Sequence, residues 1–174
     1  LTERKEMESD ILQQSIYGPI DNITSHSCAG DTFLHLSLRN QALNVAGYLI
    51  EQNADVLIEN SRGETISSLL KAMFVGKYQE LRALLKENPE AQGNIGVFLV
   101  EKFGRIHEFA VKLENKLVAE TERLMHEQAT RTYEHIVNES EDRKLTRCDE
   151  LLQLTRDIVD DYRQRLERSR VDCS

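Results

Sequence analysis

The chain of 174 residues carries 22 Lys and Arg against 30 Asp and Glu, a formal net charge of -8. Nucleic-acid binding draws much of its affinity from clustered basic contacts with phosphate, so this acidic balance argues against nucleic acid as the main ligand. The longest stretches without a charge, such as residues 11–20 and 40–50, are mixed in polarity. They are shorter than the roughly 20 apolar residues of a membrane span, so no transmembrane helix is expected.

The three cysteines Cys28, Cys148 and Cys173 are widely spaced and odd in number. This usage favours a reducing compartment over a disulfide scaffold, and we expect a cytoplasmic location. The chain begins at Leu1 with nothing that resembles a signal peptide, and we expect it to be a segment of a longer protein.

Two prolines, Pro19 and Pro89, divide the sequence into parts that differ in their pattern of apolar and turn residues. In residues 1–23, apolar side chains at helical spacing predict a short amphipathic helix that the Gly18-Pro19 pair ends. We expect this helix to cover one end of the helices that follow. Its apolar residues are Met7, Ile11, Leu12 and Ile16.

Residues 24–92 contain an internal period of 33 residues, because Gly30-Asp-Thr recurs as Gly63-Glu-Thr. Between these two triplets the pattern predicts a first helix over 31–39, a second over 44–52 and a turn at 53–56. A second unit starts at Gly63, and Gly76 stands where its two helices would meet. Each unit is a helix pair that needs neighbours or capping helices to bury its apolar face.

This region resembles the ankyrin-repeat family, with one good repeat and one degenerate repeat. Two departures are Phe33 in place of Pro and Gln41 in place of the glycine between the helices. A third, Asn53 for Gly, is mild because Asn tolerates a left-handed backbone. The matched positions are Gly30, Thr32, Leu34, His35, Leu36, Leu49, Ala54, Asp55 and Val56.

The resemblance implies structural roles for Thr32 and His35, which in such repeats form hydrogen bonds within and between turns. It also implies protein binding at the hairpin tips and on the exposed face of the first helices. Among these positions Phe33 is a candidate aromatic anchor. The predicted partner-binding residues are His26, Asp31, Phe33 and Arg39 in the first unit, and Asn60, Ser61, Arg62 and Glu64 in the second.

Residues 93–138 predict one long helix whose first part, 97–109, caps the repeats. After Leu124 the apolar register changes to a stripe that includes Met125, Ala129 and Tyr133. Residues 139–174 predict a second long helix with heptad spacing, typical of a coiled coil. Its predicted helix–helix seam is Leu145, Cys148, Leu152, Val159, Tyr162 and Leu166.

The junction between the two registers allows two structures. Asn138 followed by Glu141 matches a helix N-cap with a reciprocal glutamate, which favours two helices folded back as a hairpin. The other structure is one helix of more than 70 residues, which would extend about 110 Å. The predicted fold class is therefore all-α: a short ankyrin-like stack followed by long helices, as a hairpin or a coiled coil.

Catalytic and metal-binding motifs are incomplete in this sequence. His107-Glu108 and His126-Glu127 begin a zinc-protease pattern, but Val111 and Thr130 stand where the second histidine is required. We expect no enzyme, no metal and no cofactor.

The leading functional hypothesis is a non-enzymatic protein–protein interaction module, an adaptor or structural linker in a larger assembly. By analogy that assembly is cytoskeletal or ciliary, with protein partners and self-association through the C-terminal helix. The alternative is a regulatory or oligomerisation domain of a larger enzyme or channel.

Overall fold

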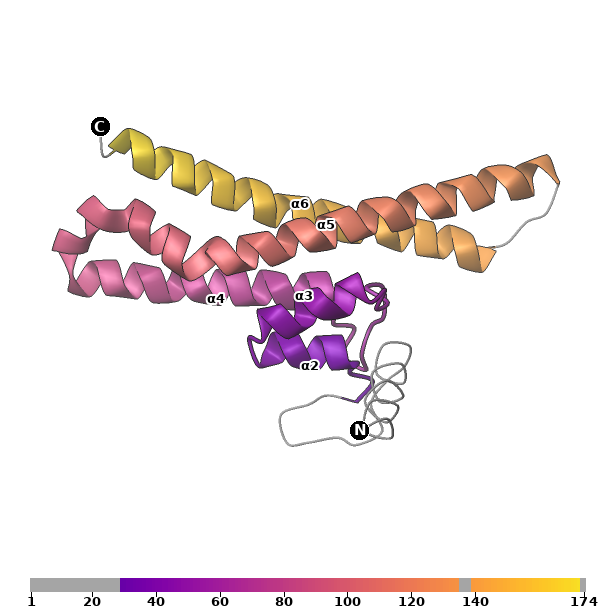
Figure 1. Cartoon of the computed structure of the whole chain (residues 1–174), viewed down its shortest axis with the longest axis horizontal. Coiled ribbons are helices and arrows are strands. Elements are labelled where there is room, and N and C mark those ends of the chain that lie inside the picture. The colour runs from indigo at the N-terminus through magenta and orange to yellow at the C-terminus, as the bar shows by residue number, and fades with distance from the viewer. Residues whose placement is uncertain (1–28, 135–138, 173–174) are drawn as a thin grey trace, which may run out of the picture. The chain divides into compact units, whose positions relative to one another are not determined.

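The computed structural model describes residues 29–134 and 139–172, and every regular element in these residues is helical (Figure 1). The protein is therefore all-α, as predicted. No helix in these two ranges is long and apolar enough to cross a membrane. The predicted N-terminal helix, with Met7, Ile11, Leu12 and Ile16, and the predicted cap at Asn138 lie outside the described residues. The elements are α2 (Phe33–Arg39), α3 (Leu43–Glu51), α4 (Ile66–Glu87), the 3-10 helix η1 (Pro89–Asn94), α5 (Ile95–Tyr133) and α6 (Glu139–Asp172).

The chain divides into two compact units, and the division falls inside α4, between Leu69 and Leu70. Unit 1 ends at Leu69 and contains α2, α3 and the first turn of α4. Unit 2 contains the rest of α4 together with η1, α5 and α6.

Unit 1 is built on the helix pair α2 and α3, which pack against each other. Thr32 caps α2 because its side chain accepts a hydrogen bond from the backbone N–H of His35, and the His35 side chain in turn accepts one from the Thr32 N–H. The two helices start within two residues of the predicted positions. The buried apolar side chains of unit 1 are Leu34, Leu38, Ala46, Leu49, Ile50, Ala54, Val56 and Ile66.

The turns of unit 1 need residues with a left-handed backbone. Gly30 and Gly63, which lie 33 residues apart, have φ of 83° and 75°. A Cβ atom on Gly30 would also lie 3.2 Å from the backbone of Asn60, so this position admits little else. Gln41 and Asn53 also have a left-handed backbone, with φ of 57° and 67°. Two turns of unit 1 thus have this conformation without a glycine.

The second predicted unit differs from the expected helix pair. Residues 66–87 form the single helix α4, and Gly76 lies within it instead of between two helices. An interior glycine costs a helix about 1 kcal/mol, which the good helix formers after it, such as Lys77, Glu80 and Leu81, offset. Helix α4 ends just before Pro89, which begins η1.

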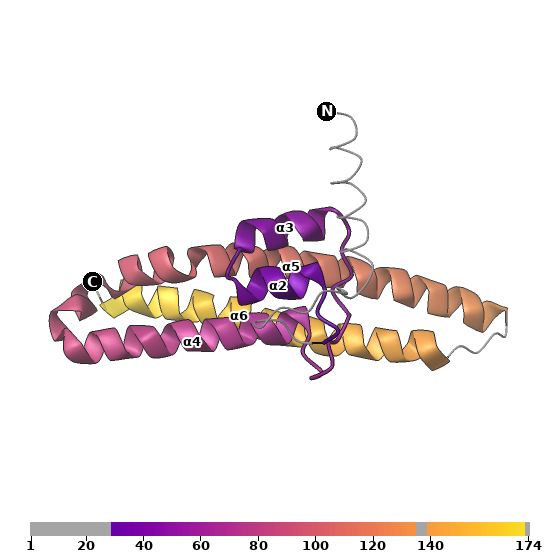
Figure 2. The same cartoon turned by 90° about the horizontal axis from the view of Figure 1, so that it is seen from below.

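The structure of unit 2 decides between the two arrangements that the sequence allows for the long helices, a hairpin or one continuous helix. Helices α5 and α6 lie side by side over much of their length and run in opposite directions (Figures 1 and 2). Helix α5 has 39 residues, a length of about 58 Å. The alternative of one continuous helix is wrong, and the two long helices form a hairpin.

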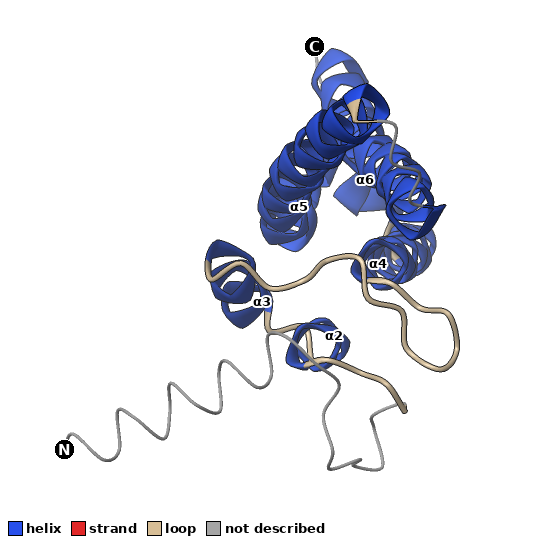
Figure 3. Ribbon diagram, turned by 90° about the vertical axis from the view of Figure 1, so that its right-hand side faces the viewer, coloured by secondary structure: helices blue, strands red, loops and turns tan. Residues whose placement is uncertain are grey.

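Helix α4 joins this hairpin through aromatic side chains. Phe103 of α5 is fully buried, and its ring lies 4.2 Å from that of Tyr78 and 5.4 Å from that of Phe74, both on α4. From α6, the guanidinium of Arg165 lies 3.9 Å from the centre of the Tyr78 ring. The three helices are neighbours when viewed end-on (Figure 3).

Candidate interaction surfaces

Four of the predicted partner-binding residues form one polar network inside unit 1. Arg39 donates hydrogen bonds to both carboxylate oxygens of Asp31, at 2.9 and 3.2 Å, and to Glu64 at 2.7 Å. The Asn60 amide donates to the same two carboxylates, at 2.9 Å each. Asp31 is buried, with 2% of its surface exposed, so its charge depends on these partners.

The hydrogen bonds of the network shift the pKa values of Glu64 and Arg39. The hydrogen bond from Arg39 holds the pKa of Glu64 below its usual range, and a second from Asn60 acts in the same direction. Hydrogen bonding to Asp31 raises the pKa of Arg39. The charges of Arg39 and Glu64 are therefore stabilised within the unit.

His35 connects the first turn of unit 1 to the second. Its Nδ1 accepts a hydrogen bond from the Thr32 N–H at 3.1 Å, and its Nε2 lies 3.0 Å from the carbonyl oxygen of Glu64. Both contacts are satisfied by a neutral ring protonated at Nε2. Burial lowers the pKa of His35, against the opposing effects of the Glu64 carbonyl and the Asp31 charge. This is a structural role for the side chain.

The other predicted partner-binding residues have different placements. Phe33 on α2 is 38% exposed. Ser61 and Arg62 are exposed on the turn before Gly63. His26 lies outside the described residues. Of the predicted residues that the structure describes, Phe33, Ser61 and Arg62 are therefore exposed to a partner. The other four form hydrogen bonds within unit 1: Asp31, Arg39, Asn60 and Glu64.

The predicted seam of α6 lies inside unit 2. Cys148, Leu152, Val159 and Tyr162 are buried, whereas Leu145 and Leu166 are half-buried. The Tyr162 ring stacks on His107 of α5 with a centroid distance of 4.6 Å. Burial raises the pKa of the Cys148 thiol, which disfavours the reactive thiolate.

An apolar groove of about 540 Å³ lies between the start of α5 and the end of α6. Val97 and Val100 in this groove are 57% and 53% exposed. Gly96 lets α5 lie close to α6 here, because a Cβ on it would lie 3.1 Å from the hydroxyl oxygen of Ser169. The residues that line the groove are Gly93, Asn94, Gly96, Val97, Val100, Glu101, Leu166, Ser169 and Arg170.

Sequence reasoning missed this groove, although one signal was present. The first turns of α5 read Ile-Gly-Val-Phe-Leu-Val and are apolar on more than one face. A helix that is apolar on several faces needs several neighbours. Leu99 is buried and Phe98 is half-buried, which leaves Val97 and Val100 at the surface.

A second exposed apolar surface lies at the other end of α5. Met125 and Tyr133 are 56% and 87% exposed, and Ala129 between them is also exposed. These three residues, spaced by four, lie along one face of the helix, and we call them the stripe. The buried row of α5, with Leu113, Leu117 and Leu124, belongs to a different register. The shift of register in the sequence therefore marks the change from a covered face to an exposed one.

Within residues 29–134 and 139–172, no group of three or more His, Cys, Asp and Glu side chains could hold a metal ion. No family model, curated protein or solved structure matched this chain in the comparisons. The candidate surfaces are thus the groove, the stripe and the exposed part of the first turns of unit 1.

Proposed function

We propose that this chain is a non-enzymatic protein–protein interaction module that acts as an adaptor or structural linker in a larger assembly. The observation that carries the proposal is the groove between α5 and α6. The surface inside it is mostly apolar, and two of its valines are more than half exposed. Exposed apolar surface of this kind favours a protein partner, and a helix laid into a groove is a common mode of recognition.

We further propose that unit 1 is an ankyrin-like element that supports such binding. The proposal is supported by the 33-residue recurrence of left-handed glycines at Gly30 and Gly63 and by the contacts of His35 with both turns. The proposed setting is a cytoplasmic assembly of cytoskeletal or ciliary type, by analogy with other chains that join such repeats to long helices.

The test compares the proteins that associate with a groove variant and with a matched control. Val97→Glu combined with Val100→Glu places two charges in the groove, whereas Val75→Glu places one on the exposed side of α4, where Val75 is 41% exposed. Proximity labelling in cells is expected to lose a set of neighbours with the groove variant and to retain it with the control. An unchanged set of neighbours, with helical content preserved in both variants, would contradict the proposal.

The stripe favours a second candidate function, that of an oligomerisation domain. The sequence predicts self-association through the C-terminal helix, α6, but the apolar seam of this helix is largely buried in the described residues. A second copy would therefore need another surface, and the stripe is exposed.

A further inference from the structure

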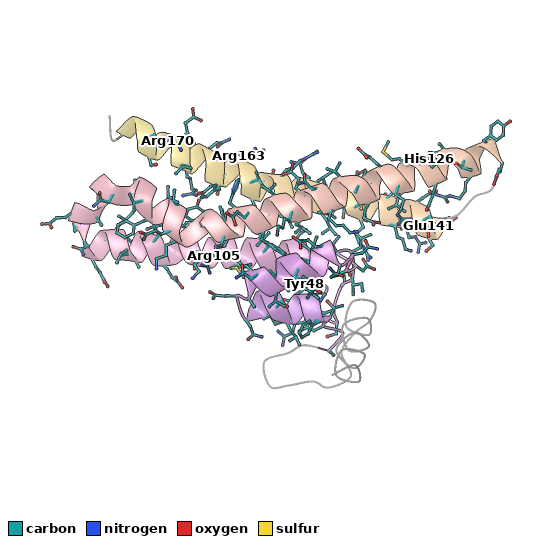
Figure 4. The ribbon with its side chains drawn as sticks, viewed as in Figure 1. Tyr48, Arg105, His126, Glu141, Arg163 and Arg170 are labelled. Carbon is teal, nitrogen blue, oxygen red and sulfur yellow. The ribbon has the colours of Figure 1, made fainter. Side chains whose placement is uncertain are left out.

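The groove and the stripe lie at opposite ends of the same helix. Val97 and Val100 stand in the first two turns of α5, and Ala129 stands in its last turns. The two surfaces are therefore separated by about 45 Å along a single helix. Figure 4 shows the same arrangement by labelled residues, with Arg163 and Arg170 at one end of the hairpin and His126 and Glu141 at the other.

The groove also has room for the side chains of the stripe. The stripe projects Met125 and Tyr133 from one helical face with only Ala129 between them, so it presents two bulky side chains and a small one over about two turns. A groove of about 540 Å³ has the volume for side chains of this size. A helix face presented to an apolar groove is the geometry of helix-in-groove recognition.

The charges around the two surfaces are opposite in sign. Residues 120–134, which carry the stripe, have four glutamates against two arginines. Residues 163–170, which border the groove, have four arginines against one glutamate. Glu101, which lines the groove, is partly offset by Lys102 and Arg105 in the next turns of α5. Glutamates therefore outnumber arginines beside the stripe, and arginines outnumber glutamates on the stretch of α6 that borders the groove.

One pair of charges lies within reach of the proposed contact. Glu122 is one turn before Met125 on the face of the stripe and is exposed, and Arg170 lines the groove. Neither makes an ion pair with another side chain in the described residues. Each is available to a partner of opposite charge.

From these observations we propose that two copies of this chain associate head to tail, with the stripe of one copy seated in the groove of the other. This inference rests on the proposed function, because it names a second copy as one protein that the groove binds. The contact is heterologous, since each copy contributes a different surface. It leaves a free groove at one end of the dimer and a free stripe at the other, so it propagates into an open chain or closes into a ring.

The experiment mixes two variants, each blocked at one surface. Val100→Glu charges the groove and leaves the stripe intact, whereas Tyr133→Glu charges the stripe and leaves the groove intact. Both residues are more than half exposed, so the core is untouched. Mass is measured by light scattering and sedimentation in reducing buffer, on the full chain of 20.0 kDa.

The unmodified protein is expected to increase in mass with concentration in steps of one chain. Each variant alone is expected to remain monomeric, and their equimolar mixture is expected to stop at the dimer. A dimer formed by Val100→Glu alone would mean that stripe meets stripe, and one formed by Tyr133→Glu alone that groove meets groove. Either result would overturn the inference, as would a mixture that stays monomeric.

A charge exchange tests the same contact without altering the apolar residues. Glu122→Arg and Arg170→Glu are each expected to weaken association roughly fivefold, as the loss of one exposed ion pair does. Both changes in one chain restore the opposite charges and are expected to recover the original affinity. Failure of this rescue would contradict the pairing of Glu122 with Arg170.

The two proposals can fail separately. An unmodified protein that remains monomeric at all concentrations would overturn head-to-tail association. The proposed function would still be tested separately, by whether the groove variant loses its neighbours in cells.

Discussion

The two units of this protein are held together in different ways. In unit 1, short helices are fixed at their ends by directional hydrogen bonds, such as those from Arg39 to Asp31 and from Thr32 to His35. In unit 2, long helices are fixed along their sides by apolar and aromatic contacts, with Phe103 packed against two rings of α4. Exposed apolar surface is largest in unit 2, at Val97, Val100 and Tyr133.

This difference shows how geometry is specified in each unit. Hydrogen bonds at turns fix the angle at which short helices meet, because each bond has a narrow range of lengths and directions. A long row of apolar side chains fixes only which faces of two helices pack together. The row continues for as long as the sequence keeps the apolar spacing. The long helices can therefore carry apolar side chains near their ends that no neighbouring helix covers. The groove and the stripe are two such places.

The largest expected effect comes from the aromatic contact of unit 2. Phe103→Ala removes a fully buried ring that contacts Phe74 and Tyr78, and it should lower the free energy of unfolding by about 3–5 kcal/mol. Denaturant unfolding followed by circular dichroism measures this loss. Hydrogen exchange should show it first in α5 and α6.

The control for this change is Val100→Ala on the same helix. Because Val100 is 53% exposed, its truncation should change the stability by less than about 0.5 kcal/mol. If Phe103→Ala instead weakens protection equally in α2 and α3, the two units unfold together and the contrast between them does not extend to their stability.

A smaller effect is expected from the polar network of unit 1. Asp31→Ala removes a buried carboxylate that accepts from Arg39 and Asn60, and it should cost about 2 kcal/mol, because Glu64 still accepts from both donors. Amide exchange in α2 and α3 measures the loss. Asp55→Ala is the matched control, since Asp55 is exposed and accepts only from the N–H of Leu57. Equal losses from both variants would mean that burial of Asp31 adds nothing.

Much of the fold could be predicted from local patterns. The turn residues around Gly30 and Asn53 located α2 and α3, and Pro89 marked the end of α4. Gly76 was misleading, because a glycine inside a helix and a glycine between two helices have the same sequence signal. The choice between them depends on packing along α4, which no local pattern contains.

The candidate surfaces were harder to predict than the fold. Asp31, Arg39, Asn60 and Glu64 have the composition of an exposed turn. Yet Arg39 pairs with Glu64 across 25 residues of sequence, and Asn60 with Asp31 across 29. Sequence alone does not show whether a charged residue has an internal partner. The groove was missed because it is formed by residues near 97 and near 166, which only the hairpin brings together.

The smallest expected effect is a pH dependence that arises at His107 of unit 2. Burial lowers the pKa of His107, and the nearby Arg163 acts in the same direction, against the weaker influence of Glu108 and Glu114. The unfolded chain therefore binds a proton at His107 at a higher pH than the folded chain does. As the pH falls from about 7 to about 5, the free energy of unfolding should decrease. We expect the decrease from this group to be under about 1 kcal/mol, because the half-buried ring is partly screened by solvent.

Amide exchange in α5 and α6 at several pH values measures this effect by position. His107→Gln should flatten the pH dependence there, whereas His126→Gln, exposed on the same helix, measures what a histidine outside the interface contributes. His35 of unit 1 has a pKa lowered in the same sense by burial, so its unit should weaken over the same pH range. The two histidines can be told apart because His107→Gln should change the slope in unit 2 and leave that of α2 and α3 unchanged. A slope in α5 and α6 that persists in His107→Gln would show that other groups control the response of the hairpin to acid.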